Sequence, residues 1–354
     1  MASTILPVWR ELGQQDGLSD LLSHHFLIPL GEANWRPFLV RDARVKEWSN
    51  VVDVSVVGKD DILHTLNTYL SRFNLATDDV KRLIAALEPA VRQTLANGGQ
   101  LLSVTGKAAG DGTITASNKT ITSVTVADKK TYAVSIVFVT YMWKPRGAPS
   151  DTAAQKLPPT SAAGDADSWF SQLRWIHAAQ DNVWFTKKNV RQLDIKNDAT
   201  PWDQITDDTI HNQSVFFDNM DTTADVTVYV IRYFSGDRAA VGMTFEAMKD
   251  KSGRQGNISK GEICIAVDSK CATLGTVIPK WDDPFIVTLA HELTHFVLAR
   301  RPIDPKLHGL HLDPKDPAND GVLFSNGHES TAVSGQLLDL IYGDPTGVNL
   351  AAPH

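Results

Sequence analysis

The stretch that most constrains the fold is residues 288–298, Thr-Leu-Ala-His-Glu-Leu-Thr-His-Phe-Val-Leu, which contains the pattern His-Glu-x-x-His. Asp283 is suited to cap a helix here and Pro284 to open it. Apolar residues recur through the stretch at helical spacing, so we expect one face of the helix to pack inward. His291 and His295 are four residues apart, which places both imidazoles on one helix face, where they can share one tetrahedral metal ion.

Glu292 follows His291 directly and therefore points beside such a metal rather than at it. A carboxylate there can take a proton from a water molecule whose pKa the metal lowers toward about 7. This division of labour is zinc peptidase chemistry, so we expect Zn²⁺ on His291 and His295, with Glu292 as general base. Two surface histidines on an ordinary helix, or a zinc site without catalysis, would show the same pattern.

The composition is that of an ordinary globular protein, with 42% hydrophobic and 21% charged residues, and 354 residues are enough for two domains. A net charge of -7 without a run of Lys and Arg argues against a nucleic-acid partner. No stretch reaches the length of a membrane span, and no secretory signal opens the chain, which predicts a cytoplasmic protein or export by a non-Sec route. Cys264 and Cys271 are expected to be reduced.

The pattern along the chain predicts two domains. Residues 1–143 indicate an α+β domain of unknown role, a pro-segment or a targeting or binding module, with helices at about 60–73 and from 77. Strand-like segments follow, including an alternating hairpin at about 119–143. Residues 144–167 are rich in Pro, Ala, Gly and Ser and are expected to be an unpacked linker.

The second domain, residues 168–354, opens with a helix expected at about 168–182. Strand-like segments come next, before the His-Glu-x-x-His helix, at residues 189–195, 225–234, 239–245 and 262–267. This order is expected when a sheet roofs a cleft whose floor is the motif helix.

From about residue 168 to residue 342 the chain resembles the zincin metallopeptidases, and within them the metzincin-like group. The resemblance rests on the order of elements, on the strand at 261–267 before the motif and on Gly-Leu-His-Leu-Asp at 309–313 beyond it. Metzincins continue the motif as H-E-x-x-H-x-x-G-x-x-H, whereas Leu298 and Arg301 stand here at the glycine and last histidine positions. The resemblance implies an α+β fold with a mixed twisted sheet over the active-site helix, preceded by a separate α+β domain.

The third zinc ligand is open. We expect His311, reached by a longer loop after a helix that ends at Pro302, because lengthening a surface loop costs little closure entropy. His308 is an alternative within the same loop, and Asp313 is a possible oxygen ligand or a group that supports the ligands. Glu329 is another, since the motif also resembles thermolysin-like peptidases, whose third ligand is a Glu on a later helix. Val333 stands where those enzymes have a further acidic residue.

The resemblance implies a zinc-dependent endopeptidase acting on a protein or peptide that binds extended along a sheet edge. Tyr342 and His328 are candidates for polarising the scissile carbonyl together with zinc. The alternative function is a binding or toxin-delivery protein whose first domain carries the activity, with a structural or inactive zinc site. A further possibility is that the first domain is an inhibitory pro-segment.

Overall fold

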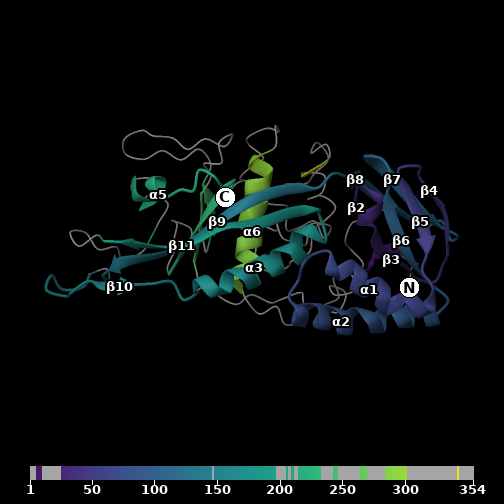
Figure 1. Ribbon diagram of the computed structural model, residues 1–354, viewed down its shortest axis with the longest axis horizontal. Helices are drawn as coiled ribbons and strands as arrows, with labels where there is room; N and C mark the ends of the chain where they lie inside the picture. The colour runs from purple at the N-terminus through teal and green to yellow at the C-terminus, as the bar shows by residue number, and fades with distance from the viewer. Residues whose placement is uncertain are drawn as a thin grey trace.

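The computed structural model is a mixed α+β protein, as the sequence predicts (Figure 1). It describes residues 5–9, 25–145, 147–196, 205, 209–210, 214–232, 242–245, 264–268, 284–300 and 341–342. Within these ranges no helix is long and apolar enough to cross a membrane. The strands of the first part of the chain lie on the right of Figure 1, and those of the second part lie on the left.

The first part of the chain, where described, forms two sheets and a helix pair. One sheet has the order β1-β3-β6-β5 and the other β2-β8-β7-β4, with α1 and α2 packed against β3 and β6 of the first. The elements are β1 (Ile5–Pro7), β2 (His25–Pro29), β3 (Arg36–Val40), β4 (Val45–Trp48), β5 (Val52–Val56), α1 (Ile62–Ser71), α2 (Thr77–Ala96), β6 (Gln100–Gly106), β7 (Gly110–Ala116) and β8 (Ile121–Ala127), with short 3₁₀ turns at Glu32–Asn34 and Lys59–Asp61.

Both helices predicted in this part are confirmed. α1 buries Leu66, Tyr69 and Leu70, which recur at helical spacing. α2 continues through Pro89, and it stops where Gly98 adopts a φ of 85°, a left-handed conformation that glycine takes without steric cost.

The second part of the chain is built on a mixed sheet that lies over the motif helix, α6 (Pro284–Ala299). The strand order is β10-β9-β12-β14-β13, and β11 also pairs with β9. β11 and β12 each pair with β9 in parallel, and β12 pairs with β14 in parallel. β10 runs antiparallel to β9, and β13 runs antiparallel to β14. The remaining elements are β9 (Lys130–Trp143), β10 (Gln155–Leu157), a 3₁₀ turn (Ala163–Asp165), α3 (Ala166–Leu173), the π-helical turn η6 (Arg174–Ala178), β11 (Val183–Ile195), α5 (Ser214–Asp218), β12 (Val226–Ile231), β13 (Gly242–Phe245) and β14 (Cys264–Asp268).

The predicted hairpin at 119–143 is wrong. β8 pairs with β2 and β7, whereas β9 pairs with β10, β11 and β12. The turn at Asp128 and Lys129 therefore passes the chain from one sheet to the next. β10 also lies within 144–167, so part of the predicted linker is a strand. The chain therefore changes from the first part's sheets to the second sheet near residue 128, while the division into two domains stays a prediction.

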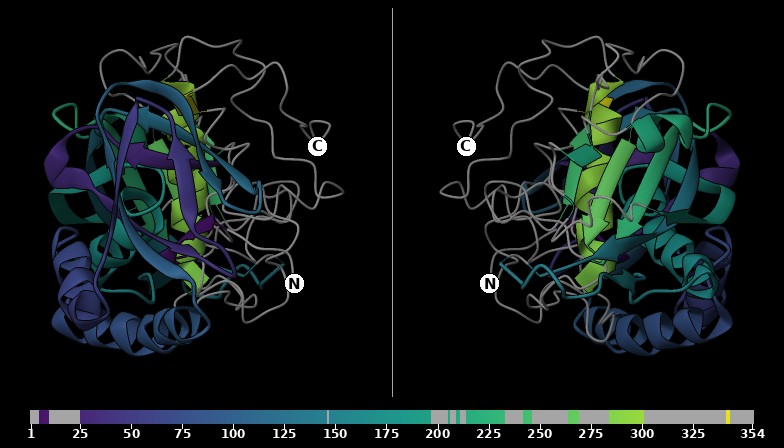
Figure 2. Two further views of the ribbon diagram at one scale, coloured as in Figure 1. Left: turned by 90° about the vertical axis from the view of Figure 1, so that its right-hand side faces the viewer. Right: turned by 90° about the vertical axis from the view of Figure 1, so that its left-hand side faces the viewer.

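Side-chain alternation gives the second sheet two buried faces. Val134, Ile136 and Phe138 of β9 belong to the core that contains α3 and α6, whereas Val137 and Val139 belong to a core on the α5 side. Figure 2 shows α6 lying along one face of this sheet. The alternation explains why β9 carries apolar residues at almost every position, because both of its faces are covered.

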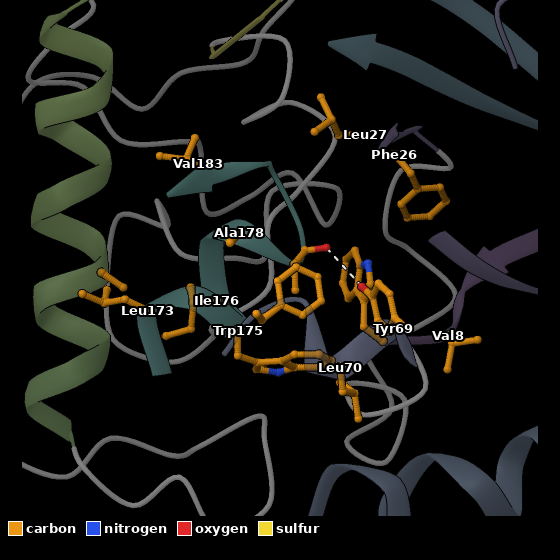
Figure 3. Packing of buried hydrophobic residues seen from close by; sticks show 14 of the residues in the cluster. Val8, Phe26, Leu27, Tyr69, Leu70, Leu173, Trp175, Ile176, Ala178 and Val183 are labelled. Carbon is orange, nitrogen blue, oxygen red and sulfur yellow. Dashed lines mark hydrogen bonds between the residues drawn. The ribbon is translucent and has the colours of Figure 1, made fainter. Parts of the chain in front are cut away.

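The two parts of the chain share one core, and buried polar contacts join them beside η6. Arg36 is 1% exposed, and its guanidinium donates to Ala178 O (3.1 Å) and to the Tyr69 hydroxyl (3.3 Å). The Tyr69 hydroxyl donates to Ala179 O at 3.4 Å (Figure 3). Trp175 and Ile176 of η6 are buried in the same cluster. The first part of the chain therefore holds the turn that follows α3.

Candidate metal centre

α6 carries the His-Glu-x-x-His motif and is buried on all sides. It begins at Pro284, as predicted, while the expected cap Asp283 and the expected stop Pro302 lie outside the described residues. The described side chains from 285 to 299 are all buried. A helix that is covered all round belongs inside a protein, which is why this one lies between the sheet and α3.

His291 and His295 face each other on α6. His291 is 3% exposed and His295 is 7% exposed, and their Nε2 atoms are 3.1 Å apart. Two nitrogens bound to one tetrahedral zinc at about 2.0–2.1 Å are themselves about 3.3 Å apart. The pair therefore has the spacing that zinc needs, although an Nε2–H···Nε2 hydrogen bond has the same length.

Glu292 lies on the side of α6 that meets β13. Its Oε2 accepts a hydrogen bond of 2.7 Å from the Thr244 hydroxyl, which is also 2.9 Å from the main-chain oxygen of Glu292. Burial raises the pKa of Glu292 from its ordinary value of 4.5 to about 7, and the hydrogen bond from Thr244 opposes this rise. A carboxyl group with this pKa can accept and release a proton near neutral pH. The pKa applies to the metal-free protein, because a nearby cation would lower it.

The sequence analysis missed His177, which touches the motif helix from η6. Its Nε2 lies 3.3 Å from Ala290 O, one residue before His291, and its Nδ1 lies 2.9 Å from Asp181 Oδ2. Both His177 and Asp181 are almost fully buried, and the other Asp181 oxygen accepts from Val183 N at 3.0 Å. The sequence signal for this pair was a His and an Asp four residues apart within the helix predicted at 168–182. The pair holds η6 against α6 at Ala290, directly before the motif.

Tyr342, a candidate for polarising the substrate carbonyl, lies beside this pair. Its hydroxyl donates to Asp181 O at 2.6 Å, and the Lys130 ammonium lies over its ring. Burial raises the pKa of Tyr342 well above its ordinary value, and the nearby Asp181 and Tyr132 raise it further. In the part of the chain that the structure describes, no hydrogen bond joins Tyr342 to Glu292, so its hydroxyl is committed to Asp181.

The other predicted site residues fall outside the described residues: His308, His311, Asp313, His328 and Glu329, as does Cys271. Among the residues that are described, no three His, Cys, Asp or Glu side chains gather as metal ligands. The structure thus brings His291, His295 and Glu292 together, while the third ligand stays a prediction.

A scan against protein-family models finds no match to this chain, and a search of the curated proteins finds no significant match.

Proposed function

We propose that this chain is a zinc-dependent endopeptidase with a zincin-like catalytic domain. The observation that carries the proposal is the geometry of α6, where the Nε2 atoms of His291 and His295 lie 3.1 Å apart and Glu292 is buried beside them. Two convergent imidazoles next to a carboxyl group of raised pKa are suited to hydrolysis by an activated water molecule.

The arrangement of strands around α6 supports the finer fold assignment. A mixed sheet lies over the helix, and its antiparallel strand β13 contacts α6 directly. Among the described residues, β13 pairs only with β14 and so leaves one edge for another strand. An extended peptide can add to such an edge through main-chain hydrogen bonds, which suits a protein or peptide substrate.

The donor set of α6 fits a zinc ion. His291 and His295 would hold it through Nε2, so each ring would carry its proton on Nδ1. The third ligand would be His311, with Glu329 and His308 as the alternatives. When bound, zinc lowers the pKa of a water molecule and polarises a carbonyl oxygen.

Glu292 accounts for the proton transfers. Its carboxylate takes a proton from the attacking water as the oxygen adds to the scissile carbonyl carbon. The same group then gives that proton to the leaving nitrogen as the C–N bond breaks, so it ends the cycle ionised. The buried position of Glu292 keeps bulk water away from this exchange.

The test is peptide cleavage by the full chain with zinc. Glu292→Gln should slow cleavage by about 10²- to 10⁴-fold while zinc stoichiometry stays unchanged. Glu47→Gln is the control, because this exposed carboxylate lies in β4, and it should cleave like the wild type. Near-native turnover by the Glu292 variant would contradict the mechanism. Zinc binding without cleavage of a mixed peptide library would favour a structural zinc site.

A further inference from the structure

We propose that β13 positions the catalytic carboxylate, with Thr244 holding one oxygen of Glu292 and Gly242 making room for the other. The catalytic role of Thr244 and Gly242 rests on the proposed function. Their contacts with Glu292 do not depend on it. Thr244 is thus a positioning residue, and its strand is also the one on which we expect substrate to bind.

The Thr244 hydroxyl connects the strand to the glutamate. A threonine hydroxyl has one proton to donate, and two acceptors lie within reach: Glu292 Oε2 at 2.7 Å and Glu292 O at 2.9 Å. The main-chain oxygen lies within α6, where helical N–H groups already bond the carbonyls. The shorter contact to Oε2 therefore fixes the side chain, and the bond becomes charge-assisted, and so stronger, when Glu292 is ionised.

Gly242 lies on the same face of β13 as Thr244, because residues two apart in a strand point the same way. A Cβ atom at Gly242 would lie 3.0 Å from both Cγ and Oε1 of Glu292 and 2.8 Å from Cγ2 of Thr288. Contacts this short require a neighbour to shift. The φ angle of Gly242 does not lie in the left-handed region, so the glycine is needed for space and not for its backbone conformation.

These two contacts give the carboxylate oxygens different roles. Oε2 is occupied by the Thr244 hydroxyl, whereas Oε1 lies close to Gly242, where a Cβ would be only 3.0 Å from it. We assign Oε1 as the atom that carries the transferred proton. Since β13 would also pair with the substrate, this strand would hold the substrate and the proton-accepting carboxylate in a fixed position relative to each other.

Three variants test this assignment. Thr244→Val removes the hydroxyl with little change in shape and should lower kcat by about 10- to 100-fold, the usual cost of losing such a supporting contact, with KM within about twofold and zinc content unchanged. Thr244→Ser keeps the hydroxyl and should retain kcat within about threefold. Gly242→Ala should lower kcat although the hydroxyl remains.

Thr227→Val is the matched control. Thr227 lies in β12 of the same sheet and is buried, but its hydroxyl accepts from Asp221 N, away from α6. It should cleave like the wild type. A wild-type kcat in Thr244→Val, or a loss confined to KM, would overturn the inference.

A second measurement separates this inference from the proposed function. In metal-free protein with ¹³C-labelled glutamate, Thr244→Val should shift the carboxyl carbon signal of Glu292, whereas Thr244→Ser and Thr227→Val should leave it in place. If the wild type cleaves no peptide, the proposed function fails and this signal still tests the contact. An unmoved signal in Thr244→Val would overturn the inference whether or not the protein is a peptidase.

Discussion

Glu292 should make the stability of the metal-free protein fall as pH rises, and Glu292→Gln should remove that dependence. The carboxyl group is almost fully buried, and burial raises its pKa to about 7. Gln has nearly the same shape and can still accept a hydrogen bond from Thr244 through its carbonyl oxygen, but it cannot ionise.

The sign follows from the two pKa values. The folded protein holds the proton on Glu292 up to about pH 7, whereas the unfolded chain releases it near 4.5. The stabilising contribution is therefore complete below pH 4.5 and is lost as pH rises through 7. The difference between the two values, at about 1.4 kcal/mol per pH unit, corresponds to about 3 kcal/mol.

The assay is urea unfolding of both proteins with a chelator at several pH values between 4.5 and 7.5. The free energy of unfolding of Glu292→Gln, minus that of the wild type, should increase by about 3 kcal/mol over this range. The zinc-bound proteins should show a smaller increase, because a nearby cation favours the ionised carboxylate. A difference that is independent of pH in the chelator would refute the reasoning.

Three further predictions concern the His177–Asp181 pair, the third zinc ligand and the segment that contains β10. His177→Phe should lower the free energy of unfolding by about 3–5 kcal/mol in urea unfolding, because it leaves Asp181 buried without its partner; an unchanged stability would contradict the pairing. After equal dialysis, His311→Ala should lose zinc by metal analysis, whereas Glu329→Ala and the control His308→Ala should keep it; the reverse result would assign the site to the Glu-liganded zincins. Limited proteolysis should cut residues 144–167 on either side of β10, with the two fragments eluting together in size-exclusion chromatography, and early cutting within β10 would contradict its pairing with β9.

The local patterns of this sequence predict α1, α2, α6 and the strands β12, β13 and β14 close to where they lie. β11 begins at Val183, before the predicted start at residue 189, and β9 and β10 of the same sheet were predicted as part of a hairpin and of a linker. Within the site, the spacing of His291 and His295 was enough to predict that their rings converge. These features depend on residues close together in sequence, where the geometry of a helix or strand fixes the outcome.

The errors concern contacts between distant segments. The segment 119–143 predicts a hairpin, but β9 is apolar at almost every position, which fits burial on both faces. Nothing in its own residues identifies β11 and β12 as its partners. The contacts of Gly242 and Thr244 with Glu292 could not be predicted for the same reason. They form only because β13, which is distant in sequence, packs on α6.

The position of β9 also changes how an inhibitory first domain can be tested. A fragment that begins at residue 165 would lack β9, which pairs with strands on both of its edges. It would also lose the contacts of Arg36 and Tyr69 with the segment after α3. Loss of activity in that fragment would therefore report loss of structure, so regulation is better tested by nicking the intact chain near residue 128.

The most direct test of the zinc site is an anomalous-difference map from crystals of the full chain grown with zinc, with data collected on both sides of the zinc absorption edge. The account predicts one peak about 2.0–2.1 Å from Nε2 of both His291 and His295, with Glu292 nearby but not bound to it. A peak elsewhere, or one coordinated by the carboxylate of Glu292 in place of either histidine, would contradict it.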